Sequence, residues 1–221
     1  MSVKTKKKVF LIDDHPTLCR GLKELIDHEK DLTVCGLVDD APRALEAIKT
    51  TRPDIVVSDL TLKDSNALEL VKDIKIRYGA LPVLILSMHD ENLYAERCLR
   101  AGARGYITKD ETIENILQAI RRVLNGDIHL STQISSRVLK KAVGAANGHT
   151  DPIDTLSDRE LEVFRLIGRG LRTADIAECL HLSIKTIETY REHIKIKLHL
   201  ENAARLTQYA VQWVQSQKLW C

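Results

Sequence analysis

Five times within its first 125 residues, the sequence alternates a short apolar run with an amphipathic stretch. The amphipathic stretches carry apolar residues three and four positions apart, as at Leu18, Leu22, Leu25 and Ile26, which predicts helices that bury one face. Several of the apolar runs are nearly continuous, as strands covered on both faces are. Five such repeats predict an open, doubly wound parallel sheet with helices on both faces and right-handed crossovers. The predicted strands are Val9–Ile12, Leu32–Val38, Ile55–Val57, Leu81–Ser87 and Gly105–Thr108.

Beyond Gly126 the pattern changes and no further strand is predicted. Residues 131–143 are compatible with one more helix, and the small, polar residues 144–152 have the composition of a linker. Four helices are predicted after the linker. The first begins with a capping box formed by Ser157 and Glu160, and we expect Thr173, Ser183 and Asn202 to begin the other three.

Composition places the chain among ordinary globular proteins. Of its 221 residues, 44% are hydrophobic and 29% are charged. The five cysteines are scattered without a CxxC pair, which argues against a disulfide framework or a zinc site. No apolar run approaches the roughly 18 residues of a membrane span, and the lysine-rich start lacks the apolar core of a signal peptide. We therefore expect a cytoplasmic protein without a membrane partner.

Polar residues stand where the predicted strands end. Asp13 and Asp14 follow the first strand, Asp59 follows the third, Ser87 ends the fourth and Lys109 follows the fifth. Sites in open parallel sheets gather at the carboxyl ends of the strands, so these groups are expected to converge. Clustered carboxylates suit Mg²⁺, which takes oxygen ligands, and one carboxylate can act as a nucleophile toward a phosphoryl group that a lysine and a hydroxyl also bind.

Residues 7–126 resemble the receiver domain of two-component response regulators in four motifs: Asp13–Pro16, Asp54–Leu60, Leu86–Met88 and Tyr106–Lys109. The resemblance implies a flavodoxin-like sheet with strand order 2-1-3-4-5. It implies that Asp59 accepts the phosphoryl group and that Lys109 contacts it. The Mg²⁺ ligands would be Asp13, Asp14, Asp59 and the backbone carbonyl of Thr61, and the switch residues would be Ser87 and Tyr106.

The segment after Asp59 departs from this family. Receivers often carry a Met-Pro pair and then a glycine, whereas this chain has Leu62, Lys63 and Ala67 at those positions. Asn66 can supply the backbone conformation of the glycine, because asparagine tolerates a left-handed conformation. The sequence therefore leaves the geometry of this loop undecided, while all the acidic residues of the receiver motif are present.

Residues 153–216 resemble the four-helix, LuxR-type helix-turn-helix DNA-binding domain, in the motifs Leu156–Val163, Ala174–Ala177, Leu182–Arg191 and Ile194–Leu198. Charge alone does not predict DNA binding, because basic and acidic residues balance in this segment. The resemblance implies phosphate contacts by Lys185, Thr186, Arg191, Lys195 and Lys197, and base-facing positions for Glu188, Thr189 and Glu192.

Together the two resemblances place the chain in the NarL/FixJ group of response regulators, with residues 127–152 as the linker that includes the expected helix 131–143. They imply a transcription regulator, not an enzyme, in which a sensor histidine kinase phosphorylates Asp59 and thereby controls binding to double-stranded DNA as a homodimer. RNA polymerase is left open as a further partner. One alternative is a constitutive DNA-binding regulator whose receiver acts as a protein-interaction module. A second alternative is a Mg²⁺-dependent phosphohydrolase. Such an enzyme would need an added substrate-binding cap or a general acid, and no remaining segment of this sequence offers one.

Overall fold

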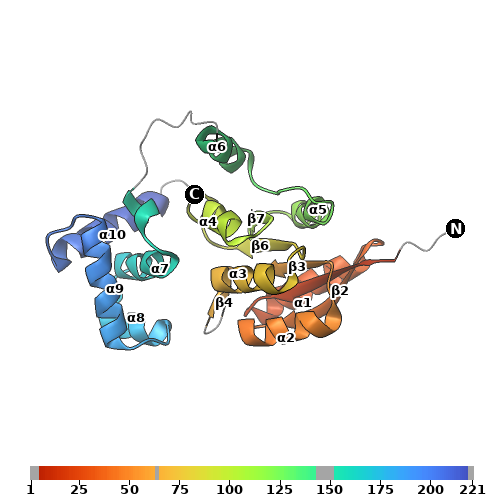
Figure 1. The fold of residues 1–221 in the computed structure, drawn as a ribbon, viewed down its shortest axis with the longest axis horizontal. Coiled ribbons are helices and arrows are strands. Elements are labelled where there is room, and N and C mark those ends of the chain that lie inside the picture. The colour runs from red at the N-terminus through yellow and green to blue at the C-terminus, as the bar shows by residue number, and fades with distance from the viewer. Residues whose placement is uncertain (1–4, 63–64, 143–151, 219–221) are drawn as a thin grey trace. The chain divides into compact units, whose positions relative to one another are not determined.

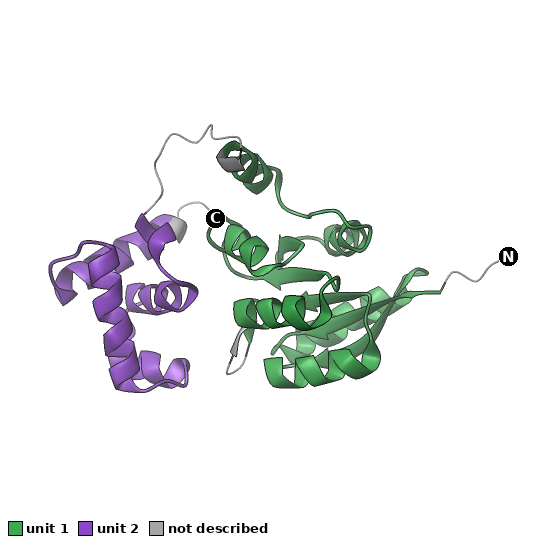
Figure 2. Ribbon diagram, viewed as in Figure 1, with its two compact units in different colours: residues 1–145 green, residues 146–221 purple. Residues whose placement is uncertain are grey.

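The computed structural model describes residues 5–62, 65–142 and 152–218. The chain divides into two compact units, residues 1–145 and 146–221 (Figure 2). The division falls within the stretch 144–152 that has linker composition. Each unit is described by itself below.

The first unit is built on a five-stranded parallel sheet (Figure 1). Its strands lie in the order β2-β1-β3-β6-β7, with β4 (Thr61–Leu62) and β5 (Ser65–Asn66) forming a separate two-stranded hairpin. Counted within the main sheet alone, this is the predicted order 2-1-3-4-5. The strands are β1 (Lys7–Ile12), β2 (Leu32–Val38), β3 (Ile55–Ser58), β6 (Val83–Ser87) and β7 (Gly105–Thr108).

Helices cover both faces of this sheet, as predicted. Val9, Leu11 and Val57 lie in one buried cluster with apolar residues of α1 and α5. Successive residues of a strand point to opposite faces, and Phe10 and Val56 are also buried, so the other face is covered too. The helices are α1 (Pro16–His28), α2 (Ala41–Thr51), α3 (Ala67–Tyr78), α4 (Glu91–Ala101) and α5 (Ile113–Leu124).

The structure differs from the sequence-based expectation at the starts of β1 and β6, at the end of β3, which includes Ser58, and in one added hairpin. β1 begins two residues before the apolar run, because Lys7 and Lys8 still pair with β2. β6 begins at Val83 and excludes Leu81, since Pro82 has no N–H to donate. The β4–β5 hairpin was not predicted, and Asn66 lies in its second strand instead of forming a left-handed turn. Lys63 lies outside the described residues.

After α5 the first unit ends in α6 (Thr132–Ala142), where the helix 131–143 was expected; residue 143 lies outside the described residues. This helix packs against α4, and Ile134 on its inner side is 1% exposed. The segment expected to be a linker therefore begins with an isolated bridge at His129 and one helix, and both belong to the packed first unit.

The second unit is all helical: the short 3-10 helix η1 (Pro152–Thr155) is followed by α7 (Asp158–Gly168), α8 (Thr173–Cys179), α9 (Ile184–Lys197) and α10 (Ala203–Lys218). Phe164 of α7 lies at its centre, with ring centroids 5.5 Å from Trp213 and 5.8 Å from Tyr209 of α10. α8 and α9 are joined by a tight turn in which His181 has φ 52°. A short helix, a tight turn and a longer helix form the predicted helix-turn-helix.

Capping residues set three of these helix starts as predicted and one differently. Ser157 accepts from the N–H of Glu160, whose carboxylate accepts from the N–H of Ser157 at 2.7 Å, which is the predicted capping box. Ser183 and Asn202 accept from backbone N–H groups at the starts of α9 and α10. The prediction that Thr173 caps α8 is wrong. Arg172 holds that position, because the Asp175 carboxylate binds both its N–H and its guanidinium.

Candidate functional site

The strand ends bring three carboxylates and one ammonium group together at one edge of the sheet. Asp13 and Asp14 follow β1, Asp59 follows β3, and Lys109 follows β7. The Nζ atom of Lys109 lies 2.7 Å from Oδ2 of Asp59 and 2.7 Å from Oδ2 of Asp13. The side chains of Lys109 and Asp59 are each 4% exposed, so these ion pairs are buried. We refer to these four residues as the acidic cluster.

Burial and charge act in opposite directions on the ionisation of this cluster. Burial raises the pKa of the Asp59 carboxyl above its ordinary value, and the Lys109 ammonium offsets only part of that effect. Burial alone would lower the pKa of Lys109, but its hydrogen bonds to Asp13 and Asp59 outweigh burial and raise it. Lys109 is therefore held in its charged form by Asp13 and Asp59, and with Asp14 the cluster contains three carboxylates and one ammonium group.

The two oxygens of Asp59 have different surroundings. Oδ1 accepts a hydrogen bond from the backbone N–H of Leu60 at 2.6 Å, whereas Oδ2 faces Lys109. Because the donor is the backbone N–H of Leu60, which does not rotate as a side chain does, it fixes the carboxylate in one orientation. The oxygen that points at Lys109 is thus presented beside the group best suited to bind an incoming phosphoryl oxygen.

Ser87 and Tyr106 meet through the backbone of His89. The N–H of His89 donates to Ser87 Oγ at 3.1 Å, and the Tyr106 hydroxyl donates to the His89 carbonyl at 2.8 Å. Tyr106 is 1% exposed, and this burial raises the pKa of its hydroxyl. The resemblance to receiver domains implies a switch aromatic at this position, and the ring of Tyr106 lies inside the protein.

Two histidines line this edge of the sheet and were not singled out by the sequence analysis. His15 Nδ1 lies 2.8 Å from Asp14 Oδ1 and 3.1 Å from Asp13 Oδ1. His89 Nε2 lies 2.7 Å from the Thr61 hydroxyl, so it joins the segment after β3 to the segment after β6. His15 directly follows the aspartate pair, which is a usable signal. The Thr61–His89 contact spans 28 residues and has no local signal.

The residues present fit a hard divalent cation. Ligand atoms of Asp13, Asp14, His15 and Asp59 all lie within 4.8 Å of one another. Oδ1 of Asp14 is buried, and its close neighbour is His15 Nδ1 at 2.8 Å, on an imidazole whose side chain is 64% exposed. Three clustered carboxylates match the oxygen-rich ligand set that Mg²⁺ prefers. These residues therefore form a ligand set that fits the predicted Mg²⁺.

The helix α9 presents the second candidate site. Ile187 and Ile194 are buried, whereas the opposite face is exposed at Lys185, Glu188, Thr189 and Glu192, which are residues predicted to contact DNA. Lys195 is half-buried and pairs with Glu192, its Nζ atom 2.8 Å from Oε1. Thr186 and Arg191 are also half-buried, nearer the edge of this face. The structure adds Ile196, which is 69% exposed near the end of the helix and was not singled out from the sequence.

One predicted DNA contact, Lys197, has a partner inside the second unit. Its Nζ atom lies 2.6 Å from Oε2 of Glu160, a residue that is only 3% exposed. Burial alone would raise the pKa of Glu160, but the hydrogen bonds from Lys197 and Ser157 outweigh it and hold the pKa below the ordinary value of 4.5. The pair joins the start of α7 to the end of α9, so it helps to hold the exposed helix in place.

We expect Glu160→Gln to lower the stability of the second unit by about 1–2 kcal/mol at pH 7, since glutamine keeps the capping box but loses the charge-assisted bond to Lys197. Because the folded-state pKa of Glu160 is lowered, its contribution is fully present above pH 4.5 and is lost as the pH falls through the lowered value. Urea unfolding of both proteins between pH 7 and pH 3 measures this. A stability difference that stays constant below pH 4 would contradict the assignment.

Two family models match the chain. Residues 9–121 match the response regulator receiver domain, and residues 154–210 match the luxR family of bacterial regulatory proteins. The oxygen regulatory protein NreC of Staphylococcus epidermidis is 30% identical over 210 residues, which cover 92% of this chain and 96% of that protein. The chain belongs to the response regulators. NreC of Staphylococcus aureus is similar at 32% identity over 209 residues.

Solved structures of response regulators share the fold. ChrA of a heme-sensing two-component system is 28% identical, with a TM-score of 0.52 over 94% of this chain and 98% of that chain. RcsB of Salmonella enterica, bound to the promoter rprA in the presence of the phosphomimetic BeF3⁻, is 24% identical with a TM-score of 0.64, over 94% of this chain and 99% of that chain. The second likeness concerns the fold alone.

This response regulator combines a receiver with a LuxR-type helix-turn-helix, and it is a phosphorylation-controlled, DNA-binding transcription regulator, not an enzyme. The receiver match includes every residue of the acidic cluster, and the luxR match includes all of α9. Within the described residues, no helix is both long enough and apolar enough to cross a bilayer.

Proposed function

We propose that Asp59 is the phosphoryl acceptor of this response regulator and that a sensor histidine kinase is the donor. The observation that carries the proposal is the buried contact of 2.7 Å between Lys109 Nζ and Asp59 Oδ2, at the strand ends that also supply Asp13 and Asp14. A carboxylate oxygen there can attack phosphorus while Lys109 binds a phosphoryl oxygen. The proposal treats residues 7–126 as the receiver, 127–152 as the linker and 153–216 as the DNA-binding domain.

In the transfer, an oxygen of Asp59 forms a bond to phosphorus as the bond from phosphorus to the histidine nitrogen of the kinase breaks. The electron pair of that bond stays with the histidine. Ser87 donates its hydroxyl hydrogen to a phosphoryl oxygen, and Lys109 exchanges its contact with Asp59 for one with the phosphoryl group. Mg²⁺, held by Asp13, Asp14, Asp59 and the backbone carbonyl of Thr61, would neutralise the added negative charge.

We expect acetyl phosphate with Mg²⁺ to add one phosphoryl group to the wild-type protein and none to Asp59→Asn, because the amide is not a nucleophile at neutral pH. Intact-mass spectrometry measures the product. Asp39→Asn is the matched control, since Asp39 is an exposed aspartate that follows the neighbouring strand β2. Equal labelling of Asp59→Asn and the wild type would show that another residue is the acceptor.

The exposed face of α9 is the proposed DNA-reading surface. Lys185, Thr186, Arg191, Lys195 and Lys197 would contact phosphates, and Glu188, Thr189 and Glu192 would face bases, with a homodimer on paired half-sites. The support is the exposure of that face and the luxR match. Lys185 and Lys197 are both exposed, but Lys197 is bound to Glu160, so its contribution to DNA binding is proposed to be smaller than that of Lys185.

We expect Lys185→Ala to weaken DNA binding by about tenfold and to reduce the slope of log K against log salt by roughly two, because the bound dimer loses two phosphate contacts, one from each subunit. Binding to fragments selected from genomic DNA at several salt concentrations measures both quantities. Lys218→Ala, at the end of α10, is the control for loss of one charge. An unchanged salt slope in Lys185→Ala would remove Lys185 from the phosphate contacts.

A further inference from the structure

The exposed face of α9 carries one large apolar side chain among its polar residues. Ile196 is 69% exposed, and it follows Glu192 by four residues and Thr189 by seven. Residues spaced in this way lie on one face of a helix. The opposite face holds Ile187 and Ile194, which are both fully buried. Ile196 therefore lies within the proposed DNA-reading surface and outside the core of the second unit.

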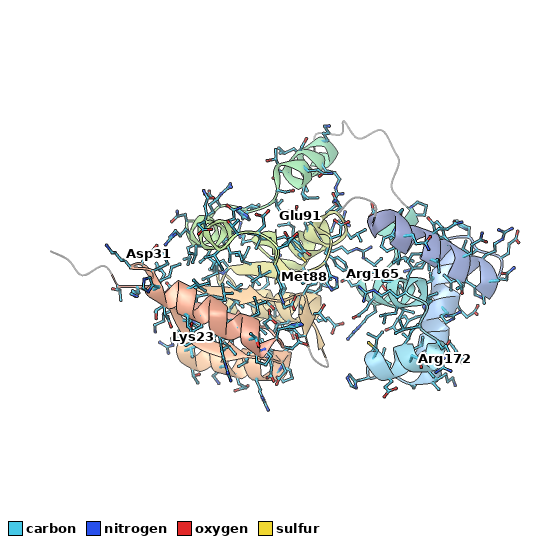
Figure 3. The ribbon with its side chains drawn as sticks, turned by 180° about the vertical axis from the view of Figure 1, so that it is seen from behind. Lys23, Asp31, Met88, Glu91, Arg165 and Arg172 are labelled. Atoms are coloured by element: carbon cyan, nitrogen blue, oxygen red, sulfur yellow. The ribbon has the colours of Figure 1, made fainter. Side chains whose placement is uncertain are left out.

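Thr189 adds a second apolar group to this face. Its hydroxyl donates to the carbonyl of Lys185 at 3.0 Å, so the single donor of this side chain is used within the helix. Thr189 is exposed, and what it offers to a partner is a methyl group beside an oxygen that can only accept. The side chains of the second unit are drawn in Figure 3, where Arg172 marks the start of α8, the helix before α9. Thr189 and Ile196 thus place apolar groups before and after Glu192.

The major groove of DNA offers such groups a specific partner. The apolar group that base edges present there is the C5 methyl of thymine, and the other groups are hydrogen-bond donors and acceptors. A single exposed isoleucine, such as Ile76 of α3 at 81%, is common on protein surfaces and needs no partner. Ile196 differs because it lies on the surface that would be buried against bases. Burial there is favourable where its methyl groups meet another apolar group.

We propose that Ile196 and the methyl group of Thr189 contact thymine C5 methyl groups, so that each half-site of the target DNA carries thymine at two positions. The inference rests on the proposed DNA-reading surface of α9. Seven residues of helix rise by roughly 10 Å, which is about three steps of 3.4 Å along DNA, so the two side chains contact different base pairs. Glu192, whose carboxylate lies 2.8 Å from Lys195 Nζ, stands between them.

Removal of single methyl groups from the DNA tests this proposal. The full-length protein, treated with acetyl phosphate and Mg²⁺, selects a duplex from a random library. Each thymine of one half-site is then replaced in turn by uracil, which lacks only the C5 methyl. We expect uracil at two of these positions to raise the Kd of the wild type by about fourfold each, the effect of one buried methyl group.

Each uracil should lose its effect in the variant that lacks the matching apolar group. Ile196→Ala is expected to bind thymine and uracil with equal Kd at one of the two positions. Thr189→Ser keeps the hydroxyl but not the methyl group, and it should do the same at the other position. Thr189→Val keeps a methyl group without the hydroxyl and should retain the wild-type ratio. Ile76→Ala, which removes an exposed isoleucine from the first unit, is the matched control and should leave every ratio unchanged.

The outcomes separate the methyl contacts from the proposed reading surface. Loss of one uracil effect in Ile196→Ala and of the other in Thr189→Ser supports both. If Lys185→Ala weakens binding while Ile196→Ala retains every uracil effect, the methyl contacts are wrong and the reading surface stands.

A lower affinity of Ile196→Ala with all uracil effects retained would indicate a contact between protein copies, and it also overturns the inference. So does a selected half-site without thymine. If neither Lys185→Ala nor the variants of Thr189 and Ile196 change binding, the methyl contacts and the reading surface are both wrong.

Discussion

Replacing Lys109 with methionine should slow phosphorylation of Asp59 by on the order of 100-fold, because the variant loses the cation that binds the phosphoryl group in the transfer. The same change should lower the free energy of unfolding by about 2–4 kcal/mol in Mg²⁺-free buffer, since it leaves buried carboxylates without their ion-pair partner. Lys109 Nζ lies 2.7 Å from both Asp13 and Asp59, so one substitution breaks two contacts. Single-turnover labelling with acetyl phosphate and urea unfolding measure the two effects.

Mg²⁺ gives this prediction a second readout. A cation that binds only the folded state stabilises it by mass action, and the carboxylates that would bind it are intact in Lys109→Met. We therefore expect Mg²⁺ to restore part of the lost stability in this variant but little of the lost phosphorylation. Lys109→Arg keeps the charge and should recover most of the stability. Phosphorylation of Lys109→Met at the wild-type rate would exclude Lys109 from the transfer.

The sheet could be predicted because its signal is local. Each strand of the main sheet contains a short apolar run, and the residues that end these runs must meet at one edge of a parallel sheet, which placed Asp13, Asp59 and Lys109 together. The β4–β5 hairpin could not be predicted in this way. It consists of two pairs of residues, and pairs such as Thr61 with Asn66 have no periodicity to detect.

The polar contacts between separate elements of the site could not be predicted from sequence patterns. His89 contacts Thr61, Ser87 and Tyr106, although nothing in the residues around it indicates any of these partners. Lys197 makes a further contact of this kind. Its place on a predicted DNA-binding helix predicts a phosphate contact, which stays a prediction, and the Glu160 carboxylate that it binds is 37 residues away in the chain. The apolar pattern therefore predicted the fold, and long-range polar contacts determine how the site is arranged.

A second large effect is expected at Gly168, the last residue of α7. A Cβ atom there would collide with the carbonyl oxygen of Ala210 on α10, so the two helices approach more closely than alanine allows. Because the obstacle is backbone and not a flexible side chain, Gly168→Ala should destabilise the second unit by about 1–3 kcal/mol, even though alanine favours helix formation. DNA binding should fall with it, whereas acetyl phosphate should still label Asp59.

The control for Gly168→Ala is Gly21→Ala. Gly21 also lies inside a helix, but a Cβ atom there would meet no other atom within 4 Å, so alanine should stabilise the first unit by about 0.5–1 kcal/mol. Unfolding followed by tryptophan fluorescence reports the second unit through Trp213, which is buried against Phe164.

Unchanged stability of Gly168→Ala would mean that α7 and α10 can separate without cost. Loss of phosphorylation in Gly168→Ala would mean that the receiver depends on the second unit. If labelling survives while DNA binding falls, the chemistry of Asp59 belongs to the receiver alone, and the second unit serves to convert it into a DNA-bound state.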